Sequence, residues 1–139
     1  MKDALPYGPP ITLQDARKVL AAAEAKAKGE GWPVAIAIVD SAADLVAFAK
    51  LDDTQHSSGG IATGKALTAV NFRRPTQVFQ EGIAAGGEGL RFLAVAGVTP
   101  LAGGFPIIEK GRIVGGIGVS GVLSSQDAEV ARAGLAAFQ

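Results

Sequence analysis

Two side chains that could do chemistry, His56 and Lys65, lie nine residues apart in the stretch LDDTQHSSGGIATGKALTAV (51–70). An imidazole carries a proton near neutral pH or binds a metal, and a lysine in apolar surroundings can act as a base or neutralise an anion. Asp52 and Gln55 precede the histidine in a polar run. One interpretation is therefore a single site in which Lys65 and His56 are catalytic or ligand-binding and Asp52 and Gln55 orient the ligand.

Lys65 falls within a predicted helix over 57–72, where small and apolar residues such as Ile61 surround it at helical spacing. An unpaired buried ammonium is costly, so a lysine in this position requires an explanation. It could hold an anionic ligand or serve as a base. Two structural alternatives stay open: its stem could extend to water, or it could pair with an acid such as Asp40 or Asp52.

The metal chemistry open to the chain is narrow. His56 is the only histidine and cysteine is absent, so thiolate sites and two-histidine sites are excluded. Zinc or iron held by His56 with Asp52 or Asp53 would be weakly bound. A haem needs only one axial protein ligand, so haem is the one cofactor that we expect, with His56 as the metal ligand. The alternative is an exposed loop histidine without a function.

A glycine pattern at 116–121 matches G-x-G-x-x-G, which invites a dinucleotide-binding interpretation. That motif requires a strand opening directly into a helix and an acid about twenty residues later, whereas here the last acid is Glu129. We instead expect these glycines to lie along a strand and to let the strand bend or another group approach its backbone.

The elements that must position these residues follow from periodicity and turn signals. A strand hairpin occurs twice, each time after a helix, and this order predicts an α+β fold with antiparallel strands. Most of the glycine-rich segment 86–104 is expected to be loop, with a short helix over 88–94. The other predicted elements are a helix from Thr12 to Gly29, strands 33–40 and 44–50, helices 57–72 and 76–84, strands 105–110 and 112–121, and a helix over 125–138.

Composition narrows the class of protein further. The 139 residues predict one domain over 1–139 with an N-terminal arm over 1–11, and 13 basic and 13 acidic side chains argue against nucleic acid as a partner. A mean hydropathy of +0.29 suggests that other subunits cover apolar surface, so we expect a homo-oligomer. The longest uncharged run, 92–108, is too short and too rich in glycine and proline to span a membrane. We expect a cytoplasmic protein without a membrane partner.

Several motifs occur in a specific order along the chain: VAIAIVD (34–40), LVAFAKLDD (45–53), the pair Lys65-Ala66, GGFPI (103–107) and GGIGVSGVLSSQD (115–127). Their order resembles that of the GlcG and HbpS family, which includes the C-terminal domain of PduO-type corrinoid adenosyltransferases. The resemblance covers nearly the whole chain. It implies a profilin-like antiparallel sheet of about five strands flanked by helices, assembled into homo-oligomers.

The resemblance also implies a ligand, because some family members bind haem or sense redox conditions and others are encoded with glycolate or diol metabolism. Lys65 and the turn formed by Gly103, Gly104, Phe105 and Pro106 match the family's most characteristic positions. We therefore expect these residues to bind the ligand together with Asp52, Gln55 and His56. The pair Asp52-Asp53 replaces the family's usual Asp-Gly, and the more polar loop favours a small polar ligand.

Three hypotheses about function follow. The first is a protein that binds haem or a small anionic metabolite in a pocket near Lys65 and His56. The second is a cofactor-independent enzyme, of isomerase, lyase or hydrolase type, that acts on a small carboxylate or carbonyl compound in a catabolic pathway. There Lys65 and His56 would transfer protons, and the Gly103 and Gly104 amides would donate to an oxyanion. The third is an oligomeric scaffold with a vestigial pocket.

Overall fold

Four strands form one antiparallel sheet in the order β2-β1-β4-β3 in the computed structural model, which describes residues 4–138. The expected α+β fold is confirmed, but the expected count of about five strands is wrong. The N-terminal segment runs beside β4, bridged at Tyr7 and Ile113 and joined by three backbone hydrogen bonds to Ile113 and Val114. It forms no fifth strand, because its three prolines lack the N–H groups that a continuous ladder would need. The strands are β1 Ala35–Asp40, β2 Leu45–Lys50, β3 Gly104–Glu109 and β4 Arg112–Ser120.

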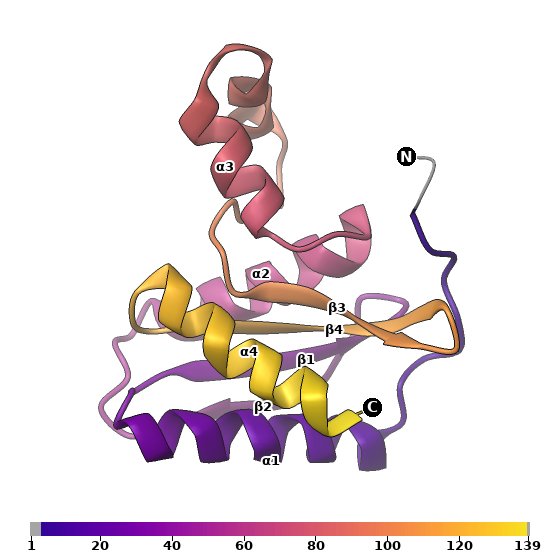
Figure 1. Ribbon diagram of the computed structural model, residues 1–139, viewed down its shortest axis with the longest axis vertical. Coiled ribbons are helices and arrows are strands. Elements are labelled where there is room, and N and C mark those ends of the chain that lie inside the picture. Colours follow the sequence, from indigo (N-terminus) through magenta and orange to yellow (C-terminus); the bar gives the residue numbers. More distant parts are fainter. Residues whose placement is uncertain (1–3, 139) are drawn as a thin grey trace.

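Helices cover both faces of this sheet (Figure 1). Two of them, α1 and α4, lie side by side on one face, and α2 lies on the other. The short helix expected over 88–94 within the segment 86–104 is confirmed, as a 3-10 helix, η1. The bounds are α1 Leu13–Glu30, α2 Ser58–Phe72, α3 Gln77–Ala85, η1 Gly87–Ala94 and α4 Ser124–Phe138. No helix between residues 4 and 138 is long and apolar enough to cross a membrane.

The two faces of the sheet are packed with different side chains. Strand β1 directs Ile36 and Ile38 into the core beneath α1 and α4, and it directs Ala35 and Ala37 towards α2. Because β1 is covered on both faces, its sequence is continuously apolar rather than alternating. Isoleucine and other large side chains therefore separate the sheet from α1 and α4, whereas mainly alanine, valine and glycine lie between the sheet and α2.

The glycines of β4 explain how α2 comes so close. A Cβ atom on Gly118 would overlap the backbone of Ala62, and one on Gly116 would lie 2.8 Å from the carbonyl oxygen of Ala66. The prediction that another group approaches the backbone of this strand is therefore confirmed, and the approaching group is α2. The helix is held against the sheet by backbone contacts, which fixes the position of its first turns.

Residues 77–101 extend away from the body of the domain, and we call this segment the projection (Figure 1). Its α3 and η1 pack on each other through Phe79, whose ring lies 5.2 Å from that of Phe72 and 4.9 Å from that of Phe92. The hydroxyl of Thr68 on α2 donates to the carbonyl oxygen of Gly64 at 2.7 Å and accepts from the amide of Thr99 at 2.9 Å. These contacts join the projection to the body.

Candidate functional site

The ammonium of Lys65 is enclosed at the centre of the protein. Its Nζ donates to the carbonyl oxygen of Val119 at 2.8 Å and to Oδ2 of Asp127 at 3.1 Å. Only 1% of Lys65 and 2% of Asp127 are exposed to solvent. The other carboxylate oxygen of Asp127 accepts from the amide of Val122 at 3.1 Å. This ion pair joins α2 to the end of β4 and to the first turn of α4.

The sequence predicted that Lys65 is unusual but not which acid it meets. Asp40, one suggested partner, instead accepts hydrogen bonds from the amides of Ala42 and Asp44 within the turn between β1 and β2. Asp127, the acid that Lys65 does meet, is not among the partners that the sequence suggested. The signal for this pairing was that both residues lie in motifs that carry the family resemblance, Lys65 in the pair Lys65-Ala66 and Asp127 in the motif 115–127.

Burial shifts both members of this pair towards their neutral forms. It lowers the pKa of Lys65, and the neighbouring Asp127 carboxylate offsets part of that change. Burial likewise raises the pKa of Asp127, against the opposing effects of the Lys65 ammonium and the Val122 amide. Burying this pair costs free energy. Removing one of the two side chains would leave the other as an unpaired buried charge.

The turn at Gly103 and Gly104 closes over Lys65. A Cβ atom on Gly103 would lie 3.0 Å from Nζ of Lys65 and 2.7 Å from the Val119 carbonyl oxygen, and Gly103 has a φ of +124°. The amide of Gly104 donates to the hydroxyl of Thr76 at 2.9 Å. The structure thus brings Lys65 and these two glycines together, with the Gly104 amide already bound within the protein.

The rest of that predicted turn, Phe105 and Pro106, belongs to strand β3. The ring of Phe105 is half-buried beneath the guanidinium of Arg132, 5.3 Å from its centroid, and Pro106 follows it in β3. Sequence reasoning missed Arg132, whose place on α4 gave no signal. A pocket of about 280 Å³ includes Arg132 and Ala102, the residue before the turn, in its lining. Its lining residues are Gln77, Gln80, Ala102, Ser125, Ala128, Glu129 and Arg132.

The loop between β2 and α2 differs from the buried Lys65–Asp127 pair, because it presents most of its polar side chains to solvent. Asp52, Gln55 and His56 are all exposed, and His56 takes part in no ion pair between residues 4 and 138. Two hydroxyls of the same segment, those of Thr54 and Ser58, are buried without a hydrogen-bond partner in the described chain. The loop therefore holds polar groups that the fold leaves unused.

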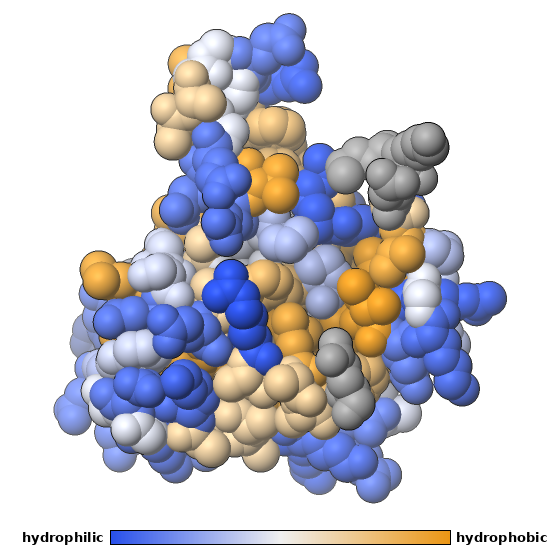
Figure 2. Space-filling model, in the orientation of Figure 1, coloured by the Kyte–Doolittle hydropathy of each residue, from blue (hydrophilic) through white to orange (hydrophobic). Residues whose placement is uncertain are grey.

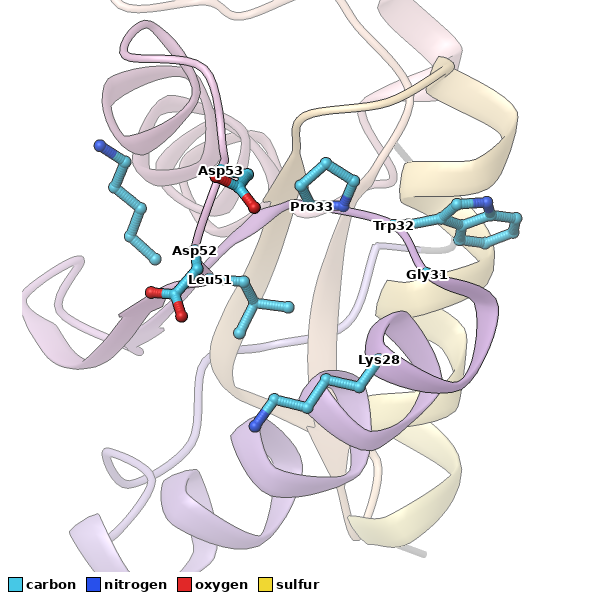
Figure 3. Close-up of a pocket in the computed structure, with 8 residues that line it drawn as sticks. Lys28, Gly31, Trp32, Pro33, Leu51, Asp52 and Asp53 are labelled. Atoms are coloured by element: carbon cyan, nitrogen blue, oxygen red, sulfur yellow. The ribbon is translucent and has the colours of Figure 1, made fainter.

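A pocket of about 480 Å³ borders this loop (Figure 3). Of the predicted ligand-binding residues, Asp52 lines it and His56 does not. The indole of Trp32 points away from Asp52 and Asp53 in the close-up, towards α4. The residues that line the pocket are Lys28, Gly31, Trp32, Pro33, Lys50, Leu51, Asp52 and Asp53.

The start of α2, next to His56, is open and partly apolar. Gly60 has nothing within 4 Å of the position a Cβ would take, and Phe48 of β2, 41% exposed, lies 3.3 Å from the corresponding position on Gly59. No group of three or more histidine, cysteine, aspartate or glutamate side chains between residues 4 and 138 could hold a bare metal ion. A lone imidazole next to the open first turn of α2 fits a haem, which needs one axial ligand, better than a bare ion.

The predicted site residues are thus divided between two places. Strand registers put the end of β2 and the start of β3 at the same end of the sheet, because Lys50 and Ser120 both pair with Ala35 and Gly104 pairs with Gly118. The order β2-β1-β4-β3 separates those two strands by three strand spacings, or about 14 Å. No single pocket described above contains His56, Lys65 and the 103–106 turn.

An antiparallel sheet that carries α2 on its glycines, with a buried lysine under a glycine turn, defines a small α+β domain of a known type. The chain belongs to the HbpS-like family. The family model, described as "Haem degrading protein HbpS-like", matches residues 11–136.

Individual relatives agree with this assignment. Protein GlcG of Escherichia coli K12 is 35% identical over 110 residues, which are 79% of this chain and 81% of the relative. A crystal structure of an HbpS double mutant from Streptomyces reticuli has a TM-score of 0.85 and 33% identity, and covers 95% of this chain and 89% of the other. The crystal structure of a PduOC haem complex has a TM-score of 0.83 and 26% identity, and covers 92% and 94%.

Proposed function

We propose that this chain is a haem-binding protein, assembled as a homo-oligomer in the cytoplasm, in which His56 is the axial ligand of the iron. The observation that carries the proposal is the exposed imidazole of His56, free of ionic partners in the described chain, beside the open first turn of α2. The family assignment and the similarity to a haem complex support it. A small anionic metabolite is the alternative ligand.

The chain's own residues would contribute in different ways. His56 would hold the iron, and exposed Phe48 and Leu45 on the edge strand β2 would offer apolar surface to the porphyrin. Asp52 and Gln55 would contact polar groups of the ligand. A bound haem would supply an iron centre capable of redox chemistry.

The roles predicted for Lys65 and the turn over 103–106 stay predictions. Lys65 is bound to Asp127, so we propose that it positions the turn and α4 rather than contacting the ligand. The hypothesis of a cofactor-independent enzyme with Lys65 as its base also stays a prediction. For that enzyme to work, the ion pair with Asp127 would have to open.

Titration of the purified protein with hemin tests the proposal. We expect a Soret band that saturates with the wild type and is lost or shifted with His56→Ala. Gln14→Ala, which changes an exposed side chain of α1 on the opposite face of the sheet, is the control and should bind with a similar spectrum. An unchanged spectrum with His56→Ala would assign the iron to another ligand, and no Soret change with the wild type would remove haem altogether.

A second function, turnover of haem, has support from the description of the family as haem degrading. It can be tested on the loaded protein by adding a reductant or peroxide and following the Soret band with time. Loss of the band faster than with free hemin, and dependence of that loss on His56, would support turnover. A Soret band that stays constant would argue against turnover and would support a role in haem binding only.

A further inference from the structure

The projection (residues 77–101) has a single fully buried side chain and many exposed apolar ones. Phe79 is fully buried in it, but η1 contributes no buried residue. Figure 2 shows apolar residues along one side of the projection and at its base. Five of the eleven large apolar side chains exposed in the described chain belong to it, and these are Val78, Leu90, Leu93, Val95 and Leu101. Apolar surface concentrated in this way marks an interaction site.

Charges are also distributed unevenly along this segment. Arg73 and Arg74 lie at its base, and the exposed Glu81 and Glu88 lie farther along it. None of these four side chains belongs to the ion pairs found between residues 4 and 138. The base therefore carries positive charge, and the outer part carries negative charge that Arg91 balances only in part.

We propose that two copies of this chain associate through their projections, packed antiparallel around a two-fold axis. In this arrangement the apolar side chains of one projection cover those of the other. The arginines at the base of each copy face the glutamates at the outer part of its partner. The inference rests on the proposed homo-oligomer and names the surface that forms it.

A second copy fits this surface for several reasons. A two-fold interface uses the same patch on both subunits, so the patch must be complementary to itself, and opposite charges at its two ends meet that condition. A stable interface takes about 20–30 residues from each partner, which is the length of the projection. The chain has no net charge, so two copies do not repel each other at long range.

The projection is also held ready for such a contact. The hydrogen bond between Thr99 and Thr68 joins the C-terminal part of the projection to α2 in the body. The side chain of Gln80 accepts from the amide of Ala102 at 2.8 Å. The guanidinium of Arg74 lies 5.7 Å from the ring centroid of Phe79. Little ordering would therefore be required when a partner binds.

The first test introduces a charge into the proposed interface. Leu93→Asp places a carboxylate at a side chain that is 65% exposed, and Leu123→Asp, at 67%, is the matched control outside the projection. Sedimentation over a range of concentrations measures the mass, and circular dichroism confirms folding. We expect the Leu93→Asp oligomer to dissociate at concentrations at least about tenfold higher than the wild type, and Leu123→Asp to behave as the wild type.

The second test exchanges charges between the copies. Arg73→Glu and Glu88→Arg should each weaken the self-association, and an equimolar mixture of the two variants should recover a complex of wild-type mass. Recovery in the mixture requires that the two side chains face each other across the interface, which a general loss of stability cannot imitate.

The outcomes separate this inference from the proposal on which it rests. A wild-type oligomer whose mass is unchanged by Leu93→Asp would overturn the assignment of the surface and leave the homo-oligomer intact. A wild type that stays monomeric at every concentration would overturn both, and would point to a different protein as the occupant of the projection. Hemin titration, measured separately, would still decide the ligand.

Discussion

The Lys65–Asp127 junction and the loop that carries His56 lie at the same end of the sheet, yet they use their polar groups in opposite ways. At the junction, two charges are buried and their hydrogen bonds join α2, β4 and α4. In the loop, an imidazole, an amide and two carboxylates stay exposed. The difference teaches that a charged residue conspicuous in the sequence can be structural, whereas a binding site needs polar groups that the fold has not already paired.

The largest expected effect is the loss of one half of the ion pair. Lys65→Met should lower the free energy of unfolding by about 3–5 kcal/mol, because it leaves the Asp127 carboxylate buried without its counter-charge. Urea denaturation at neutral pH measures the change. The double variant Lys65→Met/Asp127→Leu should recover most of the loss. A cost below about 1 kcal/mol for the single variant would contradict the junction's structural role.

The next effect concerns the turn that closes over the ammonium. Gly103→Ala should destabilise the protein by about 1–3 kcal/mol, because the new methyl group meets the Val119 carbonyl and because a φ of +124° strains any residue with a Cβ. Gly111→Ala, also at positive φ but with open space around it, is the control for backbone strain alone. Equal losses in the two variants would show that contact with the junction adds nothing.

A smaller effect is expected in the pH dependence of stability. The lowered pKa of Lys65 means that the unfolded chain binds more protons below 10.5, so this contribution to stability increases as the pH rises towards 10.5. The raised pKa of Asp127 means that the folded chain binds more protons above 3.8, so its contribution increases as the pH falls towards 3.8. Relative to Lys65→Met/Asp127→Leu, the wild type should be least stable between the two shifted pKa values. Denaturation curves that differ by a constant amount at all pH values would refute this.

The smallest effect on stability is expected in the loop. His56→Ala should change the free energy of unfolding by less than about 0.5 kcal/mol, because the side chain is exposed and supports no other element. The same variant should lose the hemin spectrum of the wild type. A large loss of stability would show that the imidazole is structural, and the contrast between the two regions would then fail.

Much of the fold could be predicted because its signals are local. Two hairpins and the helix over 57–72 follow from strand periodicity, turn residues and capping residues that stand close together in the chain. The glycines at 116–121 were correctly assigned to a strand approached by another group. The short helix expected over 88–94 is present as η1, but the glycines at 86 and 87 favour neither helix nor strand, so its 3-10 type gave no signal in the sequence.

The site was harder to predict because its pairing is not local. Lys65 and Asp127 are 62 positions apart, and only the packing of α2 and α4 around the end of β4 brings them together. The chain offers 13 acidic residues as partners, and no periodicity selects one of them. Exposure of His56 could be expected from its polar neighbours, but its separation from Lys65 depends on the order of the strands.

The seam between α2 and β4 has a consequence for how this sequence can change. Every amino acid other than glycine brings a Cβ atom, and at Gly116 and Gly118 that atom would have to displace the helix backbone or a side chain packed beside it. We therefore expect sequence changes in this chain to leave glycine at these two positions. Exposed positions outside the His56 loop and the projection can diversify while a strip of bare main chain inside the molecule stays the same.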